Sequence, residues 1–129
     1  MKLQGKILKS DTDKRLVFGW ASVVADAEGN LIVDSQGDTI NIETLENAAY
    51  EFVLRGGEGD LMHAVKGVAY LVESMVFTPE KAELLGLENV PQGWWVGFYV
   101  CDDKLWEQVK DGRFTMFSIG GRAVREELQ

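Results

Sequence analysis

The strongest pattern in the chain is a series of segments in which apolar and other side chains alternate, which is typical of β-strands. A turn over residues 26–30 separates two of them, because Gly29 and Asn30 tolerate a positive φ. A strand-rich fold is therefore expected. The expected strands cover residues 3–9, 15–25, 31–33, 67–77, 93–101 and 113–123.

The expected strand over 93–101 is apolar on both faces. Trp94, Val96, Phe98 and Val100 point one way, and Trp95, Gly97, Tyr99 and Cys101 point the other. A strand with two apolar faces is typical of a sheet covered on both sides, as in a barrel wrapped by helices.

Three segments have the 3.6-residue period of a helix instead. The first runs from Ile42 to about Leu54, with Asn41 as its N-cap and Gly56-Gly57 as its stop. Its apolar face is formed by Leu45, Ala48, Ala49, Phe52 and Val53. Helical segments of this length between strands indicate an α+β fold dominated by strands.

The other two helices are short and are marked mainly by their ends. Thr78-Pro79 is a capping residue followed by proline at the first helical position, and this helix ends near Gly86. The last helix, about 103–110, is capped by Asp102 and closed by Gly112.

Composition limits the classes of partner. The 129 residues fit one domain, 1–129, with 46% hydrophobic and 26% charged residues. A net charge of −8 argues against a nucleic-acid surface, and no apolar run is long enough for a membrane span. A single cysteine allows no intrachain disulfide, so a reducing interior is expected.

Two residues stand out as candidates for catalysis. His63, the only histidine, follows a glycine-rich loop and precedes a strand, although a surface histidine without a role has the same appearance. Ser118 interrupts an apolar strand just before Gly120-Gly121, whose N–H groups can face a developing oxyanion. The alternative is a serine bonded to a neighbouring carbonyl, with the glycines marking a bulge.

Other candidates are weaker. One histidine and one cysteine do not make a metal site, and Cys101 on an apolar strand is more typical of an inert buried thiol than of a thiol nucleophile. Glu73 is the one acid on an apolar stripe with Leu71, Met75 and Phe77, so we expect it to be buried and paired with His63 or with an arginine.

Several segments together resemble phage proteases, and the resemblance covers almost the whole chain. The segments FGWASV at 18–23 and VDSQGDTI at 33–40 resemble the N-terminal signature of phage prohead proteases. The XkdF-type phage serine proteases are resembled by DLMH at 60–63, VESMVFTPEK at 72–81, GWWVG at 93–97 and MFSIGGRA at 116–123.

The resemblance implies an assemblin-like β-barrel with surrounding short helices, shared with the maturation proteases of herpesviruses. It implies a serine endopeptidase with Ser118 as nucleophile and His63 as general base, acting on phage scaffold protein, major capsid protein or both. The expected location is the cytoplasm of the bacterial host, inside the immature capsid, and a homodimer is compatible with this fold.

The third catalytic residue is not evident. In related families it follows the serine by more than ten positions, whereas this chain ends at Gln129. Glu73 and Glu126, with Glu127 beside it, are the acids available, and we expect the chain to be truncated relative to a longer polypeptide.

The expected mechanism needs neither a metal nor a cofactor. Backbone N–H groups around Gly120, Gly121 and Arg122 would bind the oxyanion, with Arg122 adding positive potential. Two alternatives share the fold: a catalytically degenerate module that binds scaffold or coat protein, and a small hydrolase acting on esters that are not peptides.

Overall fold

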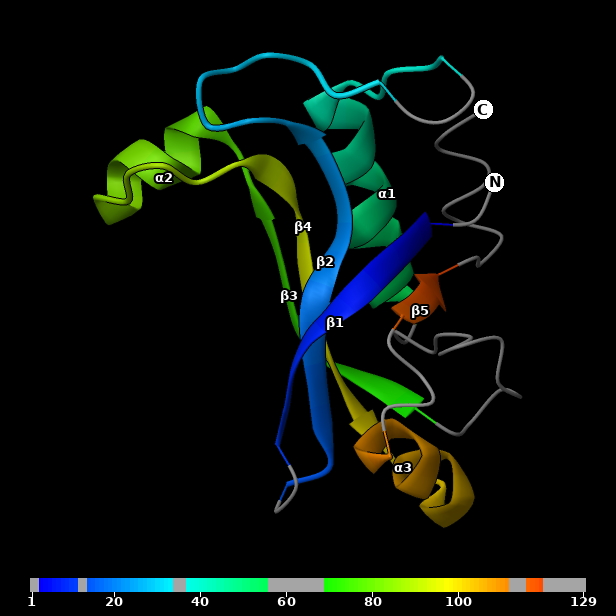
Figure 1. Ribbon diagram of the computed structural model, residues 1–129. Coiled ribbons are helices and arrows are strands. Elements are labelled where there is room, and N and C mark those ends of the chain that lie inside the picture. Colours follow the sequence, from blue (N-terminus) through cyan, green and yellow to red (C-terminus); the bar gives the residue numbers. More distant parts are fainter. Residues whose placement is uncertain (1–2, 12–13, 34–36, 56–68, 112–115, 120–129) are drawn as a thin grey trace.

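The protein is an α+β domain in which strands dominate, as expected from the sequence. The computed structural model describes residues 3–11, 14–33, 37–55, 69–111 and 116–119 (Figure 1). Its elements are β1 (Leu3–Asp11), β2 (Leu16–Ala25), α1 (Ile42–Leu54), β3 (Ala69–Phe77), α2 (Pro79–Leu85), β4 (Gln92–Val100), α3 (Asp103–Lys110) and β5 (Met116–Ile119). None of these helices combines the length and the apolar character needed to cross a membrane.

The strands form one antiparallel sheet in the order β3-β4-β2-β1-β5. The two halves of β1 pair with different strands: Ile7–Asp11 pair with β2, and Leu3–Lys6 pair with β5. In the part of the chain that the structure describes, no ladder joins β3 to β5, so the sheet is open there. Closure into a barrel stays a prediction.

All three helices begin where the sequence predicts. The side chain of Asn41 accepts a hydrogen bond from the N–H of Glu43 at 2.7 Å, and Thr78 caps α2 through the N–H of Lys81 at 3.2 Å. Asp102 caps α3 in the same way at 2.7 Å. Gly86 ends α2 with a φ of 67°, a conformation in which glycine avoids the Cβ strain of other residues.

The core lies between the sheet and the helices α1 and α3 (Figure 1). The predicted inner face of β4 is confirmed, because Trp94, Val96, Phe98 and Val100 are each 0% exposed. From α1, the ring of Phe52 meets Trp94 edge to face at 5.7 Å between centroids. From α3, the buried residues are Leu105, Trp106 and Val109.

The opposite face of β4 is only partly covered. Trp20 packs edge to face against both Trp95 and Phe77, with ring centroids 5.4 and 5.6 Å apart. Tyr99 is 39% exposed, so the expectation that both faces are fully covered is wrong at this end of the strand. The reason is that α1 and α3 both pack on the face of Trp94.

The predicted turn after β2 is present and is held by Asp26. Its carboxylate accepts hydrogen bonds from the backbone N–H groups of Asn30 at 2.9 Å and Glu28 at 3.0 Å, and Gly29 has a φ of 89°. The bonds from Asn30 lower the pKa of Asp26 most. The strand expected over 31–33 is reduced to one bridge, between Ala25 and Leu31.

A side chain at Gly93 should disturb the packing of β2 on β4. A Cβ at this position would lie 2.4 Å from the carbonyl oxygen of Ser22 and 3.0 Å from the Cα of Val23, so backbone atoms would have to move. We expect Gly93→Ala to lower the free energy of unfolding by about 3 kcal/mol, measured by chemical denaturation.

Gly86→Ala is the matched control, because a Cβ there meets nothing within 4 Å and only the positive φ is strained. It should cost about 1 to 2 kcal/mol. Equal stability of Gly93→Ala and wild type would contradict the close packing of β2 on β4.

Candidate functional site

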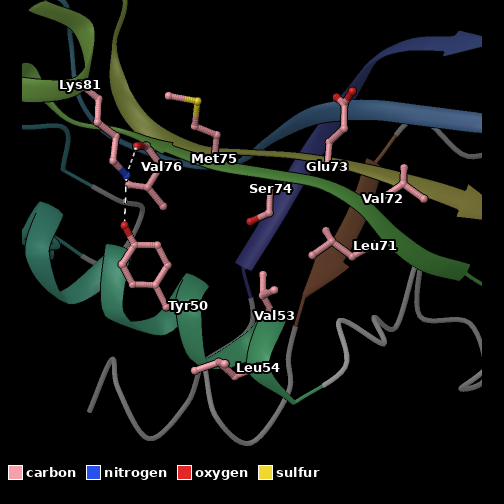
Figure 2. A pocket seen from close by; sticks show the side chains of 10 residues that line it. All are labelled: Tyr50, Val53, Leu54, Leu71, Val72, Glu73, Ser74, Met75, Val76 and Lys81. Atoms are coloured by element: carbon pink, nitrogen blue, oxygen red, sulfur yellow. Dashed lines mark hydrogen bonds between the residues drawn. The ribbon is translucent and has the colours of Figure 1, made fainter. Parts of the chain in front are cut away.

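Ser118 lies on β5, and its backbone is paired with Gln4 of β1. Figures 1 and 2 both draw β5 near the C-terminal end of α1. The other residues predicted for the active site, His63, Gly120, Gly121, Arg122, Glu126 and Glu127, lie outside the described residues. The contact between Ser118 and His63 therefore stays a prediction.

Glu73 is exposed, and the expectation that it is buried and paired is wrong. It lies on β3 opposite Gly97, and within the described ranges no hydrogen bond or ion pair to its carboxylate is found. The cause is an irregularity in the register of β3 against β4 between Leu71 and Glu73. The role of Glu73 as third catalytic residue stays a prediction.

This bulge reverses the alternation of side chains along β3. In Figure 2, Leu71 and Ser74 point toward α1, whereas Glu73 and Met75 point to the opposite side. Ser74 accepts a hydrogen bond from the indole nitrogen Nε1 of Trp94 at 2.9 Å, which fixes its direction. A strict alternation would have placed Glu73 and Leu71 on one face.

Cys101 directly follows β4 and is half-buried, less enclosed than expected. Its carbonyl oxygen accepts a hydrogen bond from Nη2 of Arg15 at 3.3 Å. No cluster of three or more His, Cys, Asp or Glu side chains suited to a metal ion occurs among the described residues. Gly37, in the segment VDSQGDTI, has a φ of 81°, a conformation that glycine adopts without Cβ strain.

A groove of about 720 Å³ lies between α1 and β3 (Figure 2). The helix contributes Tyr50, Val53 and Leu54, the strand contributes residues 71–76, and Lys81 of α2 completes the lining. Sequence reasoning missed this groove. Val53 was expected on the buried face of α1 but is 45% exposed, and Leu54 is 78% exposed. The available signal was that Val53 and Leu54 are adjacent apolar residues. Neighbouring residues of a helix point in different directions, so the two could not both lie on one buried face.

Lys81 closes one end of the groove by joining three elements. Its Nζ donates to Oε2 of Glu46 at 2.7 Å, to the hydroxyl of Tyr50 at 3.2 Å and to the carbonyl oxygen of Val76 at 3.0 Å. Tyr50 in turn donates to Oε2 of Glu46 at 3.0 Å. This network fixes the outer surface of α1 against the end of β3 and the start of α2.

The network shifts the pKa values of both charged groups. The hydrogen bond from Lys81 is the main cause of a lowered pKa for Glu46, and it outweighs burial, which acts in the opposite direction. Burial is the largest single effect on Lys81 and lowers its pKa, but the hydrogen bonds to Glu46 and Tyr50 and the charge interactions with them together exceed it and raise the pKa. Both groups are thus charged over a wide range of pH.

The Lys81–Glu46 pair should make stability depend on pH. Because the pKa of Glu46 is lowered on folding, its contribution is complete above pH 4.5, its ordinary pKa, and is lost as the pH falls through the folded value. Because the pKa of Lys81 is raised on folding, the contribution of Lys81 to stability is lost only as the pH rises above 10.5. We expect Lys81→Met to lower the free energy of unfolding by about 1 to 2 kcal/mol at pH 7, with the difference from wild type shrinking below pH 4.5.

Lys110→Met is the control for this pair. Lys110 contacts Glu107 at 3.0 Å within α3, but the two side chains are 37% and 64% exposed. Such a surface pair contributes about 0.3 kcal/mol. Urea denaturation of both variants from pH 3 to 8 tests the comparison, and equal losses at pH 7 would show that the network adds nothing beyond a surface pair.

Comparison with known proteins identifies relatives along nearly the whole chain. XkdF of the phage-like element PBSX of Bacillus subtilis (strain 168) is 31% identical over 121 residues, 92% of this chain and 42% of XkdF. YqbD of the same organism is 32% identical over 126 residues, 96% of this chain and 37% of YqbD. The chain thus spans about two-fifths of the length of these relatives. No solved structure matches.

The match to a protein family agrees with these relatives. Residues 5–127 match the family described as "Putative phage serine protease XkdF", a span that includes both His63 and Ser118. The chain therefore belongs to this family of phage proteins.

Proposed function

We propose that this domain is a serine endopeptidase that cleaves scaffold protein, coat protein or both while a phage capsid matures in the host cytoplasm. The observation that carries the proposal is the family match over residues 5–127, because the family is described as a phage serine protease and the match includes His63 and Ser118. The position of Ser118 on a short strand directly before Gly120-Gly121 supports it.

In the proposed mechanism, Ser118 Oγ attacks the scissile carbonyl carbon while His63 accepts its proton. The tetrahedral oxyanion is bound by backbone N–H groups of Gly120 and Gly121, and Arg122 adds positive potential. The bond to the leaving amine then breaks as His63 returns the proton. Water, activated by the same histidine, hydrolyses the acyl-enzyme. Either Glu73 or Glu126 would orient the imidazole.

Labelling with a fluorophosphonate, followed by mass spectrometry, tests this function without knowledge of the substrate. The label should attach to Ser118 and to no other serine. Ser74→Ala is the matched control, because Ser74 already accepts a hydrogen bond from Trp94 and plays no part in the mechanism, so labelling should persist. The same measurement is to be repeated on a longer polypeptide of the family, since the relatives are much longer than this chain.

The result also separates the enzyme from a docking module. A folded protein that binds scaffold or coat protein, but takes up no label in either the short or the longer form, would replace the protease proposal by the docking module. Label on a serine other than Ser118 would overturn the assignment of the nucleophile.

A further inference from the structure

We propose that the groove between α1 and β3 binds an extended segment of the protein substrate, with apolar side chains at alternate positions and a lysine or arginine between them. That the occupant is a substrate rests on the proposed function. The complementarity of the groove to such a peptide rests on the contacts described next and is independent of catalysis.

The first argument concerns the backbone of β3. This strand pairs with β4 on one side, and no other described strand pairs with it, so it is an edge of the sheet that the described residues form. An edge strand offers N–H and C=O groups to which an extended peptide can add as a further strand. The open stretch ends at Val76, because its carbonyl oxygen accepts a hydrogen bond from Lys81.

The second argument concerns the side chains beside this edge. Leu54, Val53 and Val72 are 78%, 45% and 51% exposed, and all three line the groove. Figure 2 shows Val53 of α1 pointing toward Leu71 across the hollow, with Leu54 beyond it at the end of the helix. In an added strand, every second side chain would point toward this apolar wall and remove it from water.

The third argument concerns charge. The two charged side chains in the lining are Lys81 and Glu73, and Lys81 is neutralised by Glu46 at 2.7 Å. Glu73 has no ion pair with any described residue and points to the side opposite α1 (Figure 2). The intervening side chains of an added strand point to that same side, where a cation opposite Glu73 is favoured. The net charge of −8 also favours a basic peptide.

Binding of two fluorescent nine-residue peptides, followed by anisotropy, tests the proposal. One has valine at every second position and lysine at the central intervening position, and the other has glutamate in place of that lysine. We expect the wild-type chain to bind the lysine peptide about three to five times more tightly. Glu73→Lys should reverse the preference.

Leu54→Gln tests the apolar wall and should weaken binding of both peptides at least about tenfold. Leu84→Gln is the matched control, because Leu84 on α2 is 77% exposed and does not line the groove. It should leave both affinities unchanged. Circular dichroism of each variant shows whether it folds, and faster amide exchange in β3 without peptide than with it would report the added strand.

Three outcomes would overturn the proposal. The first is equal weakening by Leu54→Gln and Leu84→Gln. The second is binding that appears only after residues 120–129 are deleted, which would assign the groove to this chain itself. The third is a dimer that Leu54→Gln dissociates in sedimentation velocity, which would assign it to a second copy.

Ser118→Ala separates this proposal from the function on which it rests. The variant should bind the lysine peptide as tightly as the wild type does. Retained binding with no fluorophosphonate labelling of the wild type, in either the short or the longer form, would overturn the protease and leave the groove in place. Labelling at Ser118 with no preference between the two peptides would support the protease and overturn the proposal for the groove.

Discussion

Ser118→Ala should lower the rate of peptide cleavage by about 10⁴ to 10⁶, because in the proposed mechanism Ser118 and His63 act as a unit and the loss of either removes most of the catalysis. The rate is measured in cis on a chain fused to scaffold protein, or in trans on coat protein. The change adds no bulk to β5, so the fold should persist. Cleavage by Ser118→Ala at the wild-type rate would refute the mechanism.

His63→Ala should lower the rate by a similar factor, and the pH profile gives an independent check. A histidine in water titrates near pH ~6.5, and the base must be neutral to accept a proton. Cleavage should therefore rise through this region and reach a plateau above it. Circular dichroism of both variants shows whether an inactive protein is still folded.

Trp94→Ala should cause the largest loss of stability, about 4 kcal/mol in the free energy of unfolding. The side chain is 0% exposed, packs edge to face on Phe52 and donates a hydrogen bond to Ser74. Its removal leaves a cavity where β4 meets α1. Since a domain of this size has a total stability of about 5 to 15 kcal/mol, the variant would be close to unfolding at 37 °C.

Trp95→Ala is the control, because Trp95 is the neighbouring residue on the other, half-buried face of β4. It should cost about 1 to 2 kcal/mol, mostly through the lost contact with Trp20 at 5.4 Å. Guanidinium denaturation of both variants gives the comparison. A greater loss for Trp95→Ala would mean that the two faces of β4 are assigned the wrong way round.

The helices could be predicted from the sequence because their boundaries depend on local chemistry. Asn41, Thr78 and Asp102 each accept a hydrogen bond from an N–H two or three residues ahead, so the signal and its partner are close in the chain. The inner face of β4 was predictable for a similar reason, since four large apolar residues at alternate positions allow one register.

The groove could not be predicted, because it depends on contacts between distant segments. Nothing near Glu73 in the sequence marks the bulge that turns it away from Leu71, since the bulge belongs to the pairing of β3 with β4. The exposure of Val53 likewise depends on where α1 ends over β3. The location of Ser118 on a strand was predicted, but its pairing with Gln4 joins the two ends of the chain and has no local signal.

That pairing has a consequence for biosynthesis. Of the described strands, β1 is translated first and β5 last, yet Leu3–Lys6 form their ladder with β5. Contacts between such distant segments form late, because the whole intervening loop must close first. During translation, the hydrogen bonds between Leu3–Lys6 of β1 and β5 are therefore not yet formed. The strand that carries Ser118 therefore joins the sheet only after the rest of the described domain has been synthesised.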